Sequence, residues 1–365
     1  MKVLYDGQIF RLQRYGGISR YFCELAPRID AASGVRARIL APRHRNEYLR
    51  AVGRPIALGW HDGSDRDPGR LARLAMRACQ RWTPALWRPE VLHETYYFGE
   101  LAASSPRTRR VLTLYDAIHE RHPDRFRNAA NMTRAKRAAA ARADLVICIS
   151  ESTRRDAIEL LGIAPEKLAV THLAAQMPPP APPGPPEAGG APYLLYVGER
   201  GGYKNWGAMI AAIAASATLR ELRLVCFGGG PFTAEEVALL QRLGLEPARI
   251  TQQDGDDRRL AALYAGALCL VYPSLYEGFG IPPLEAMQCG CPVVCSGTSS
   301  LPEVVGDAAA QFDPQDPESM RAAIEGVAGS PEMAAVLRER GRAQAARFSW
   351  DRCASQTLAL YRRLQ

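Results

Sequence analysis

The stretch LCLVYPSLYEGFGIPPLEAM, residues 268–287, places two glutamates on either side of a segment rich in glycine and proline. Its first six residues form an apolar run that ends at Pro273, which favours a buried strand that the proline terminates. Pro282 and Pro283 favour the start of a helix, where a missing backbone N–H does no harm. The stretch therefore predicts a strand, a glycine loop and a helix, in the manner of a parallel α/β sheet.

The loop of this stretch has the composition of a ligand site. Gly278 and Gly280 allow unusual backbone angles and the close approach of a ligand. The N–H groups around Gly280 and Ile281, at the helix start, favour a phosphate. Glu277 on the loop and Glu285, expected in the first helical turn, can accept hydrogen bonds from vicinal hydroxyls. Together these features predict a sugar-nucleotide pocket; the alternative is a surface charge at Glu277 and a helix-stabilising acid at Glu285.

A second glycine loop lies in YVGERGGYKNW, residues 196–206, again after an apolar strand and before a helical pattern. It carries Arg200 and Lys204, and two cations beside a glycine loop can hold a diphosphate. The alternative is a solvated surface loop.

Short apolar runs alternate with helical patterns along the chain. This alternation predicts parallel sheets, so the expected fold class is α/β with two Rossmann-like, doubly wound domains facing across a cleft. Ser150 or Ser152 is expected to cap a helix. The expected strands lie in residues 1–7, 35–42, 110–116, 143–152, 193–200, 222–230, 268–274 and 292–296, and the expected helices in residues 15–29, 205–216, 233–244 and 283–290.

The best domain boundary is MPPPAPPGPPEAGGAP, residues 177–192, because proline at this density continues neither a helix nor a central strand. We expect an N-terminal domain in residues 1–176, this segment as a linker, and a C-terminal domain in residues 193–346.

The chain has 365 residues, 47% of them hydrophobic, which fits a globular protein of two domains. A net charge of +8 favours an anionic partner such as a phosphorylated ligand, a membrane surface or nucleic acid. The start MKVLYDGQIF has no signal-peptide core and no apolar run is long enough to span a bilayer, so we expect a cytoplasmic location. The nine cysteines are expected to be free and mostly buried.

Residues 69–88, GRLARLAMRACQRWTPALWR, mix arginines with leucine, methionine and tryptophan, which predicts a basic amphipathic helix. It is either a surface helix whose arginine stems pack on the core or a peripheral contact with an anionic membrane. Residues 127–144 add positive charge. The aromatic residues are not interleaved with these basic segments as a base-stacking platform requires, so no nucleic-acid partner is expected.

These motifs resemble those of glycosyltransferase family 4, retaining enzymes of the GT-B fold. Glu277 and Glu285 with the intervening GFGIPPL resemble its paired-glutamate motif, and YVGERGGYKN resembles its diphosphate-binding loop. VVCSGTSSLPEVVGDAA, residues 293–309, is similar to the stretch that follows the motif. The opening YDGQIFRLQRYGGISRYF, residues 5–22, resembles the N-terminal glycine loop of a bacterial surface-polysaccharide branch often associated with mannose transfer.

The C-terminal FSWDRCASQTLALYRRL, residues 348–364, resembles a helix that crosses back to the N-terminal domain, expected here over residues 347–365. The resemblance also implies roles for single residues. Arg200 and Lys204 would hold the donor diphosphate and stabilise the leaving nucleotide, whose phosphate gains negative charge in the transition state. Glu277 would lie near the donor sugar hydroxyls and Glu285 would hold the ribose. The implied donor site also includes Gly16, Gly17, Gly198, Phe279, Gly280 and Ile281.

No metal or other cofactor is expected beyond the nucleotide-sugar co-substrate, because in this family cations and helix dipoles take the role of a metal. Residues 61–67, HDGSDRD, indicate a polar loop rather than an Asp-x-Asp metal site. Cys289, Cys291 and Cys295 lack metal-site spacing and are expected to be small core residues.

One departure from the family pattern concerns the N-terminal domain. Many members have a histidine directly before an aspartate at a strand end, facing the donor sugar, whereas here Tyr115 precedes Asp116 and His119 follows. We favour Asp116 with His119; His93, at another strand end, is the alternative histidine. Either histidine can also be an ordinary, partly exposed strand-end residue.

The sequence therefore predicts a retaining, metal-independent hexosyltransferase. The expected donor is GDP-mannose, and the expected acceptor is a glycan or lipid-linked glycan of surface-polysaccharide biosynthesis at the inner face of the cell membrane. Two alternatives remain open. One is another GT-B sugar-nucleotide enzyme, an epimerase or a phosphorylase; the other is a non-catalytic module that binds a sugar nucleotide.

Overall fold

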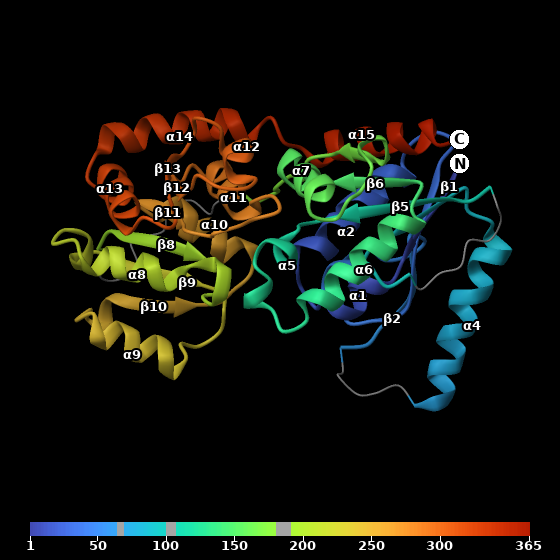
Figure 1. The fold of residues 1–365 in the computed structure, drawn as a ribbon, viewed down its shortest axis with the longest axis horizontal. Coiled ribbons are helices and arrows are strands. Elements are labelled where there is room, and N and C mark those ends of the chain that lie inside the picture. The colour runs from blue at the N-terminus through green and yellow to red at the C-terminus, as the bar shows by residue number, and fades with distance from the viewer. Residues whose placement is uncertain (64–68, 100–106, 180–190) are drawn as a thin grey trace. The chain divides into compact units, whose positions relative to one another are not determined.

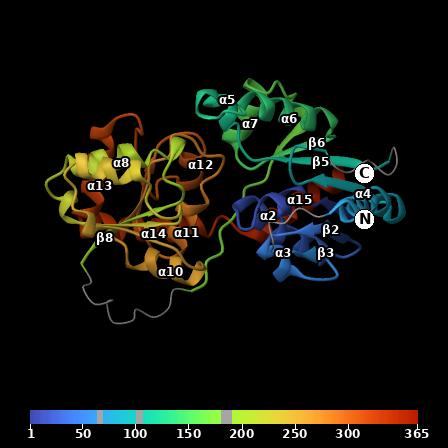
Figure 2. The ribbon, with the colours of Figure 1, turned by 90° about the horizontal axis from the view of Figure 1, so that it is seen from below.

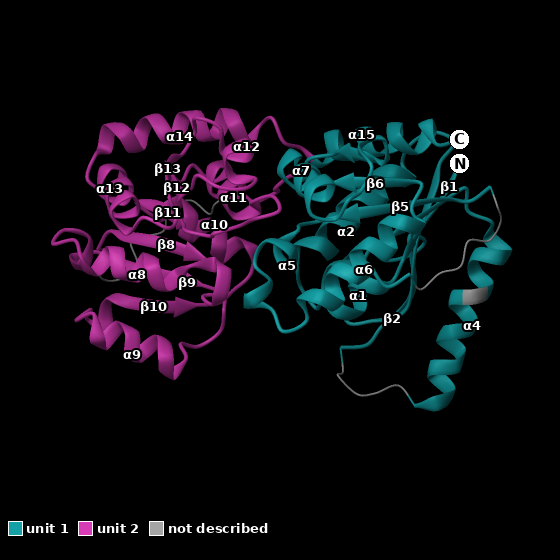
Figure 3. Ribbon diagram, viewed as in Figure 1, with its two compact units in different colours: residues 1–173, 350–365 teal, residues 174–349 magenta. Residues whose placement is uncertain are grey.

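The computed structural model describes residues 1–63, 69–99, 107–179 and 191–365. The chain divides into two compact units (Figure 3): unit 1 comprises residues 1–173 and 350–365, and unit 2 comprises residues 174–349. Residues 180–190, most of the proline-rich segment expected to be a linker, lie outside the described residues, as does the greater part of the acidic loop at residues 61–67.

Unit 1 is built on a sheet whose described strands all pair in parallel, in the order β3-β2-β1-β4-β5-β6-β7 (Figure 1). The expected α/β class is thus confirmed. The strands are β1 (Lys2–Asp6), β2 (Arg36–His44), β3 (Ala57–His61), β4 (Val91–Glu94), β5 (Arg109–Leu114), β6 (Leu145–Cys148) and β7 (Leu168–Val170).

The helices of unit 1 follow from local signals in the sequence. The side chain of Ser150 accepts a hydrogen bond from the N–H of Thr153, which identifies Ser150 as the expected N-cap. The C-terminal helix, residues 350–363, belongs to unit 1 although it follows unit 2 in the chain. The helices are α1 (Gln8–Leu12), α2 (Gly17–Asp30), α3 (Glu47–Val52), α4 (Arg70–Trp87), α5 (Ile118–Arg121), α6 (Ala129–Arg142), α7 (Glu151–Glu159) and α15 (Trp350–Arg363).

Unit 2 repeats this architecture with the strand order β10-β9-β8-β11-β12-β13, again entirely parallel among the described strands. Its strands are β8 (Tyr193–Val197), β9 (Arg223–Phe227), β10 (Ile250–Gln253), β11 (Cys269–Tyr272), β12 (Val293–Ser296) and β13 (Ala310–Phe312). Its helices are α8 (Trp206–Ala214), α9 (Ala234–Arg242), α10 (Asp257–Gly266), α11 (Ile281–Gln288), α12 (Leu301–Val305), α13 (Pro317–Ala328) and α14 (Pro331–Ala345).

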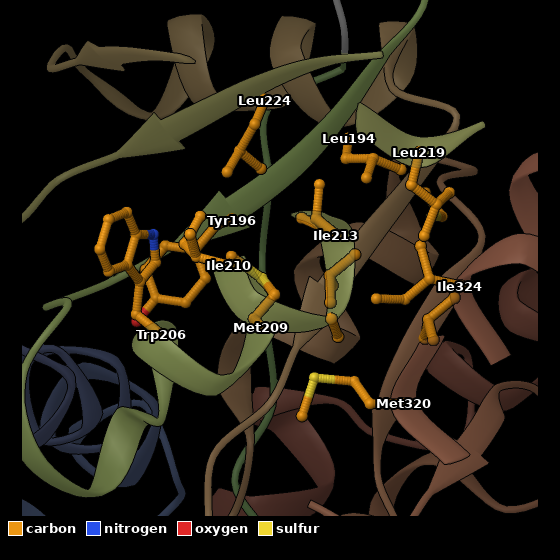
Figure 4. Packing of buried hydrophobic residues seen from close by; sticks show 14 of the residues in the cluster. Leu194, Tyr196, Trp206, Met209, Ile210, Ile213, Leu219, Leu224, Met320 and Ile324 are labelled. Carbon is orange, nitrogen blue, oxygen red and sulfur yellow. The ribbon is translucent and has the colours of Figure 1, made fainter. Parts of the chain in front are cut away.

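The sheet of unit 2 is covered on both faces, since α8 packs with α13 on one side and α11 with α14 on the other (Figure 2). Figure 4 shows the first of these layers, in which the α8 side chains of Trp206, Met209 and Ile213 are buried among residues of β8, β9 and α13. Such a layer fixes where each strand ends, and the loops at the strand ends carry the candidate site.

Both sheets change winding direction beside their first strand, because the chain runs outward from β1 to β3 and then returns to β4, and likewise from β8 to β10 and then to β11. Ligands of doubly wound sheets bind outside the carboxyl ends of the strands at this switch point. The two loops singled out in the sequence follow β8 and β11, so in unit 2 they flank the switch point directly.

Candidate active site

The loop after β8 and the loop after β11 meet through Lys204 and Glu277. The Nζ atom of Lys204 lies 2.7 Å from Oε1 of Glu277 and 3.1 Å from the hydroxyl oxygen of Tyr272, which itself donates to Glu277 at 2.8 Å. Burial alone would lower the pKa of Lys204, but the charge of Glu277 outweighs it and raises that pKa well above its ordinary value. Lys204 is therefore a permanent cation at the switch point.

The loop that carries Glu277 is held in place by hydrogen bonds to three hydroxyl residues that follow β12. The N–H of Glu277 donates to Oγ of Ser299, and Oγ of Ser300 lies 2.8 Å from the carbonyl oxygens of both Glu277 and Phe279. Thr298 reaches the carbonyl of Leu275. From the sequence alone, residues 293–309 are only similar to a family segment. The run of three hydroxyl residues after a strand, Thr298, Ser299 and Ser300, is the available signal for this role.

Glu285 is placed differently from the expectation. α11 begins at Ile281 with Gly280 as N-cap, so Glu285 lies in the second turn and not in the first. The side chain is buried, and the hydroxyl of Tyr264 lies 3.3 Å from its Oε2. Burial, followed by the charge of Glu285, raises the pKa of Tyr264 well above its ordinary value, which keeps this tyrosine a donor. The reading of Glu285 as a first-turn acid is thus wrong.

Gly280 and Phe279 shape the start of α11. Gly280 has a φ of 114°, and a Cβ atom there would lie 2.7 Å from Cδ2 of Leu301, so only glycine fits. Phe279 is buried and its ring packs edge-on against Phe348, with 5.8 Å between the ring centroids. Phe279 thus anchors the loop in unit 2 through its side chain.

Arg200 does not join Lys204 in the structure. Its guanidinium donates to the carbonyl oxygens of Gly228, Gly229, Gly230 and Pro231 at 2.8–3.2 Å and to Glu236 at 3.0 Å. Its carbon Cζ also lies 4.6 Å from the ring centroid of Phe232. Arg200 therefore shapes the glycine loop after β9, and the sequence reasoning did not foresee this.

That glycine loop has an unusual backbone, because Gly228, Gly229 and Gly230 have φ values of 83°, 71° and 67°. Its carbonyl groups turn towards Arg200 as a consequence. Gly198, directly after β8, also has a positive φ, 128°, and its carbonyl oxygen would lie 3.0 Å from a Cβ atom at Gly229. A side chain would therefore be crowded at Gly229. Gly198, Gly228 and Gly230 have open space around them, and it is their positive φ that favours glycine.

In unit 1, Asp116 and His119 lie on the segment that follows β5. The buried ammonium group of Lys136 donates to the carbonyl oxygen and the carboxylate of Asp116, at 3.0 Å each, and to Glu120 at 2.9 Å. His119 is half-buried and its ring lies tilted against Phe126, with 4.6 Å between the ring centroids. Its Nδ1 has no hydrogen-bond partner among the described residues. Burial, and then the charge of Lys136, lowers the pKa of His119. Lys136 is a residue that the sequence reasoning missed.

His93 is a core residue. It is fully buried, with Nδ1 2.5 Å from the hydroxyl of Tyr361 on α15 and Nε2 2.8 Å from Oγ1 of Thr113 on β5. Burial lowers the pKa of His93 to about 3, so the ring is neutral. The expectation of a partly exposed histidine is wrong at this position, because His93 holds α15 on the sheet.

The N-terminal glycine loop is held by a glutamine. The side chain of Gln13 accepts from the N–H of Ser19, and Ser19 Oγ donates to the carbonyl of Gly16. Gly16 is the N-cap of α2 and Gly17 its first residue. A Cβ atom at Gly16 would displace the terminal amide of Gln13.

At the switch point of unit 1, a carboxylate that the sequence reasoning missed joins the ends of β1 and β4. Asp6 is fully buried and accepts from the N–H and hydroxyl of Thr95 and from Gln8. Burial raises the pKa of Asp6 to about 6, although these hydrogen bonds lower it. An acid directly before Gly7 at a strand end was the available signal.

Among the described residues, no group of three or more His, Cys, Asp or Glu side chains is arranged to hold a metal ion. The cysteines after α11 are buried free thiols, which confirms their reading as core residues: Cys289, Cys291 and Cys295. Within the described ranges, no helix is long and apolar enough to cross a membrane.

Comparison with known families assigns both halves of the chain. Residues 15–174 match the model described as Glycosyltransferase Family 4, and residues 182–344 match the model described as Glycosyl transferases group 1. Together these matches include both switch-point loops of unit 2, the paired glutamates and the Asp116 segment of unit 1.

Individual proteins are similar to the chain over different lengths. The O-antigen chain mannosyltransferase B of Escherichia coli is 30% identical and aligns with 95% of this chain and 96% of that protein. The MMP alpha-(1->4)-mannosyltransferase of Mycolicibacterium hassiacum is 39% identical, over 34% of this chain and 31% of its own length. The solved structure of sucrose-phosphate synthase from Thermosynechococcus elongatus has a TM-score of 0.77 at 20% identity, covers 100% of this chain and 98% of that one, and indicates the fold.

Proposed function

We propose, from the premise that this chain belongs to glycosyltransferase family 4 and is a glycosyltransferase of the GT-B fold, that it transfers mannose from GDP-mannose to a glycan or lipid-linked acceptor of surface-polysaccharide biosynthesis. Mannose as the sugar is supported by the Escherichia coli relative, a mannosyltransferase that aligns with almost the whole chain.

The observation that carries the proposal is the pair of Lys204 and Glu277 at the switch point of unit 2, with Tyr272 bridging the two side chains. A lysine in this position can exchange part of its contact with Glu277 for the oxygens of a donor diphosphate, since an ammonium group has three donor hydrogens. Its raised pKa keeps the charge in place while negative charge grows on the leaving nucleotide.

We assign the other side chains accordingly. Glu277 accepts hydrogen bonds from the donor sugar hydroxyls, and Glu285 holds the ribose of the nucleotide. The N–H groups around Gly280 and Ile281, at the start of α11, face the phosphates. In this scheme positive charge comes from Lys204 and the helix start, no metal takes part, and the sugar is transferred with retention, assisted by the leaving phosphate.

The structure adds detail to the predicted roles of Arg200 and of the pair Asp116 and His119. For Arg200 to bind the diphosphate, its guanidinium would have to release some of its carbonyl contacts in the glycine loop. We therefore propose that Arg200 acts on the donor mainly by shaping that loop. Asp116 and His119 act on the transferred sugar, with Lys136 fixing the orientation of Asp116.

The test is nucleotide release from GDP-mannose with and without a mannose-containing lipid-linked oligosaccharide as acceptor, with UDP-glucose as a parallel donor. We expect GDP release that depends on acceptor and is lost in Lys204→Ala but kept in the control Lys167→Ala, a lysine of unit 1 that bonds a helix carbonyl. Conversion of the donor to another sugar nucleotide without acceptor would instead indicate an epimerase. A sugar phosphate formed from inorganic phosphate would indicate a phosphorylase. Binding of the donor without turnover would indicate a non-catalytic module.

A further inference from the structure

α4 presents an apolar stripe to solvent. Leu71 and Leu86 are 82% and 81% exposed, and Leu74 and Trp82 are 53% and 58% exposed. Leu71 and Leu74 are three residues apart, Leu74 and Trp82 eight, and Trp82 and Leu86 four, and these spacings place all four on one side of the helix. Away from this stripe, Pro84 is buried and Met76 is partly buried. α4 therefore has apolar residues where a surface helix normally places charges.

Exposed apolar side chains are concentrated in unit 1. Large ones gathered on one surface of a protein that is soluble in water usually mark an interaction site. Of the exposed large apolar side chains in the described residues, unit 2 contributes only Val237, Met333 and Val336, and none of these is aromatic. Unit 1 contributes Leu12, Tyr15, Trp60, Leu71, Leu74, Trp82, Leu86 and Phe98.

The charges around the stripe have one sign. Arg70, Arg73 and Arg77 are exposed along one flank of α4, and residues 69–88 contain no aspartate or glutamate. The same bias extends over the unit: unit 1 has 33 of the 46 Lys and Arg residues against 19 of the 38 Asp and Glu residues, whereas unit 2 has 13 against 19. The formal net charges are thus +14 and −6.

We propose that α4 lies in the surface of an anionic lipid bilayer, with its leucines and Trp82 among the acyl chains and its arginines against the lipid phosphates. An apolar stripe flanked by arginines matches that surface in both polarity and charge. Figure 1 shows α4 at the margin of unit 1, where its outer side is not covered by other described elements. The inference extends the proposed function, because a lipid-linked acceptor lies at the same surface.

Cys79 provides a reporter inside the helix itself. All nine cysteines lie in described residues, and Cys79 alone is exposed. The buried thiols also react slowly; burial raises the pKa of Cys148 and of Cys269 to about 12, for example. An environment-sensitive fluorophore on Cys79 is titrated with vesicles of phosphatidylcholine mixed with phosphatidylglycerol, and separately with pure phosphatidylcholine vesicles. We expect a blue-shifted, brighter emission with the anionic vesicles and a much weaker response with the neutral ones.

The variant Leu71→Ser/Leu86→Ser removes two side chains that contribute nothing to the core. Loss of two leucines from the lipid-facing side is expected to weaken vesicle binding at least about tenfold. The matched control Met333→Ser/Val336→Ser, which removes two exposed apolar side chains of α14, is expected to bind as the unchanged protein does.

Three outcomes would overturn the inference. The first is no binding to anionic vesicles, and the second is unchanged vesicle binding by Leu71→Ser/Leu86→Ser. The third is sedimentation of the unchanged protein as a dimer and of this variant as a monomer. That result would show that the stripe binds a second copy of the chain. GDP binding measured without vesicles is expected to be the same in all these variants. Failure of the membrane inference is therefore distinguishable from failure of the proposed transferase.

Discussion

The ammonium group of Lys204 lies 2.7 Å from the carboxylate of Glu277, although the two residues stand on loops that follow different strands, β8 and β11. These strands are neighbours in the sheet but are separated in the chain by β9 and β10. The ion pair therefore exists only because the sheet reverses its winding between them, and it couples the loop expected to bind phosphate to the loop expected to bind sugar.

Lys204→Ala is expected to reduce kcat about 10²–10³-fold, the usual effect of removing one group that stabilises developing charge. Lys204→Arg keeps the charge and should recover part of the rate. Steady-state transfer rates test this, with circular dichroism to verify that the variants fold. A transfer rate for Lys204→Ala within about twofold of the unchanged enzyme would contradict a role for Lys204 in the mechanism. A tenfold change in rate corresponds to about 1.4 kcal/mol of activation free energy, so a twofold change is far smaller than the expected effect.

Ser300→Ala tests whether the hydroxyl residues after β12 position the Glu277 loop. Ser300 Oγ is buried and bonds two carbonyl groups of that loop, so its loss should cost about 1–3 kcal/mol of unfolding free energy. The donor KM should rise as well, because the loop loses its tether. Ser355→Ala, at an exposed position of α15, is the control and should change neither quantity.

Gly280→Ala is expected to destabilise unit 2 and impair donor binding, because its φ of 114° and the contact with Leu301 both exclude a side chain. The matched change is Gly326→Ala in the interior of α13, where nothing lies within 4 Å of an added Cβ. That variant should gain about 0.5–1 kcal/mol of stability, since alanine favours a helix over glycine. Chemical denaturation of the two variants compares them directly; equal effects would contradict the account of Gly280.

His93 predicts a pH dependence of unfolding. Its folded pKa of about 3 lies below the ordinary value of 6.5, so between these two values the unfolded chain binds a proton that the folded chain does not. The contribution of neutral His93 to the free energy of unfolding is complete above pH 6.5 and is lost as the pH falls towards 3. At pH 5 the loss is on the order of 2 kcal/mol.

The variant His93→Gln isolates this contribution from other groups. His44, whose pKa burial lowers to about 4, acts in the same direction, and Asp6, whose pKa burial raises to about 6, acts in the opposite one. The unfolding free energy of the variant should therefore be lower than that of the unchanged protein at pH 7.5, and the difference should shrink towards pH 5. A difference that is constant over this range would mean that His93 is not a neutral core residue.

The architecture of unit 2 could be predicted from the sequence because each apolar run is followed by a clear turn or helix signal. The apolar run before Pro273 is β11, and the proline pair after Gly280 falls in the first turn of α11. By contrast, β10 and β13 were not expected, since Ile250–Gln253 and Ala310–Phe312 are short and only partly apolar. Edge strands of this kind are fixed by pairing with neighbours rather than by their own pattern.

The side-chain partners in the candidate site could not be predicted from spacing along the chain. Lys204 pairs with Glu277, but Arg200, only four residues earlier, turns to the loop after β9. His93 and His119 are both near strand ends, yet only His93 is closed in by α15. The partner of each side chain depends on which distant segment of the chain packs against it, and a single sequence carries little information about such packing.

The most direct test of the account is calorimetric titration of the purified protein with GDP, GDP-mannose, UDP and UDP-glucose, with Lys204→Ala as the comparison. We predict selective binding of GDP and GDP-mannose that weakens when Lys204 is replaced. Preferential binding of UDP or UDP-glucose would contradict the assignment of the donor but keep the site. Absence of binding by all four nucleotides would contradict the donor site at Lys204 and Glu277 itself.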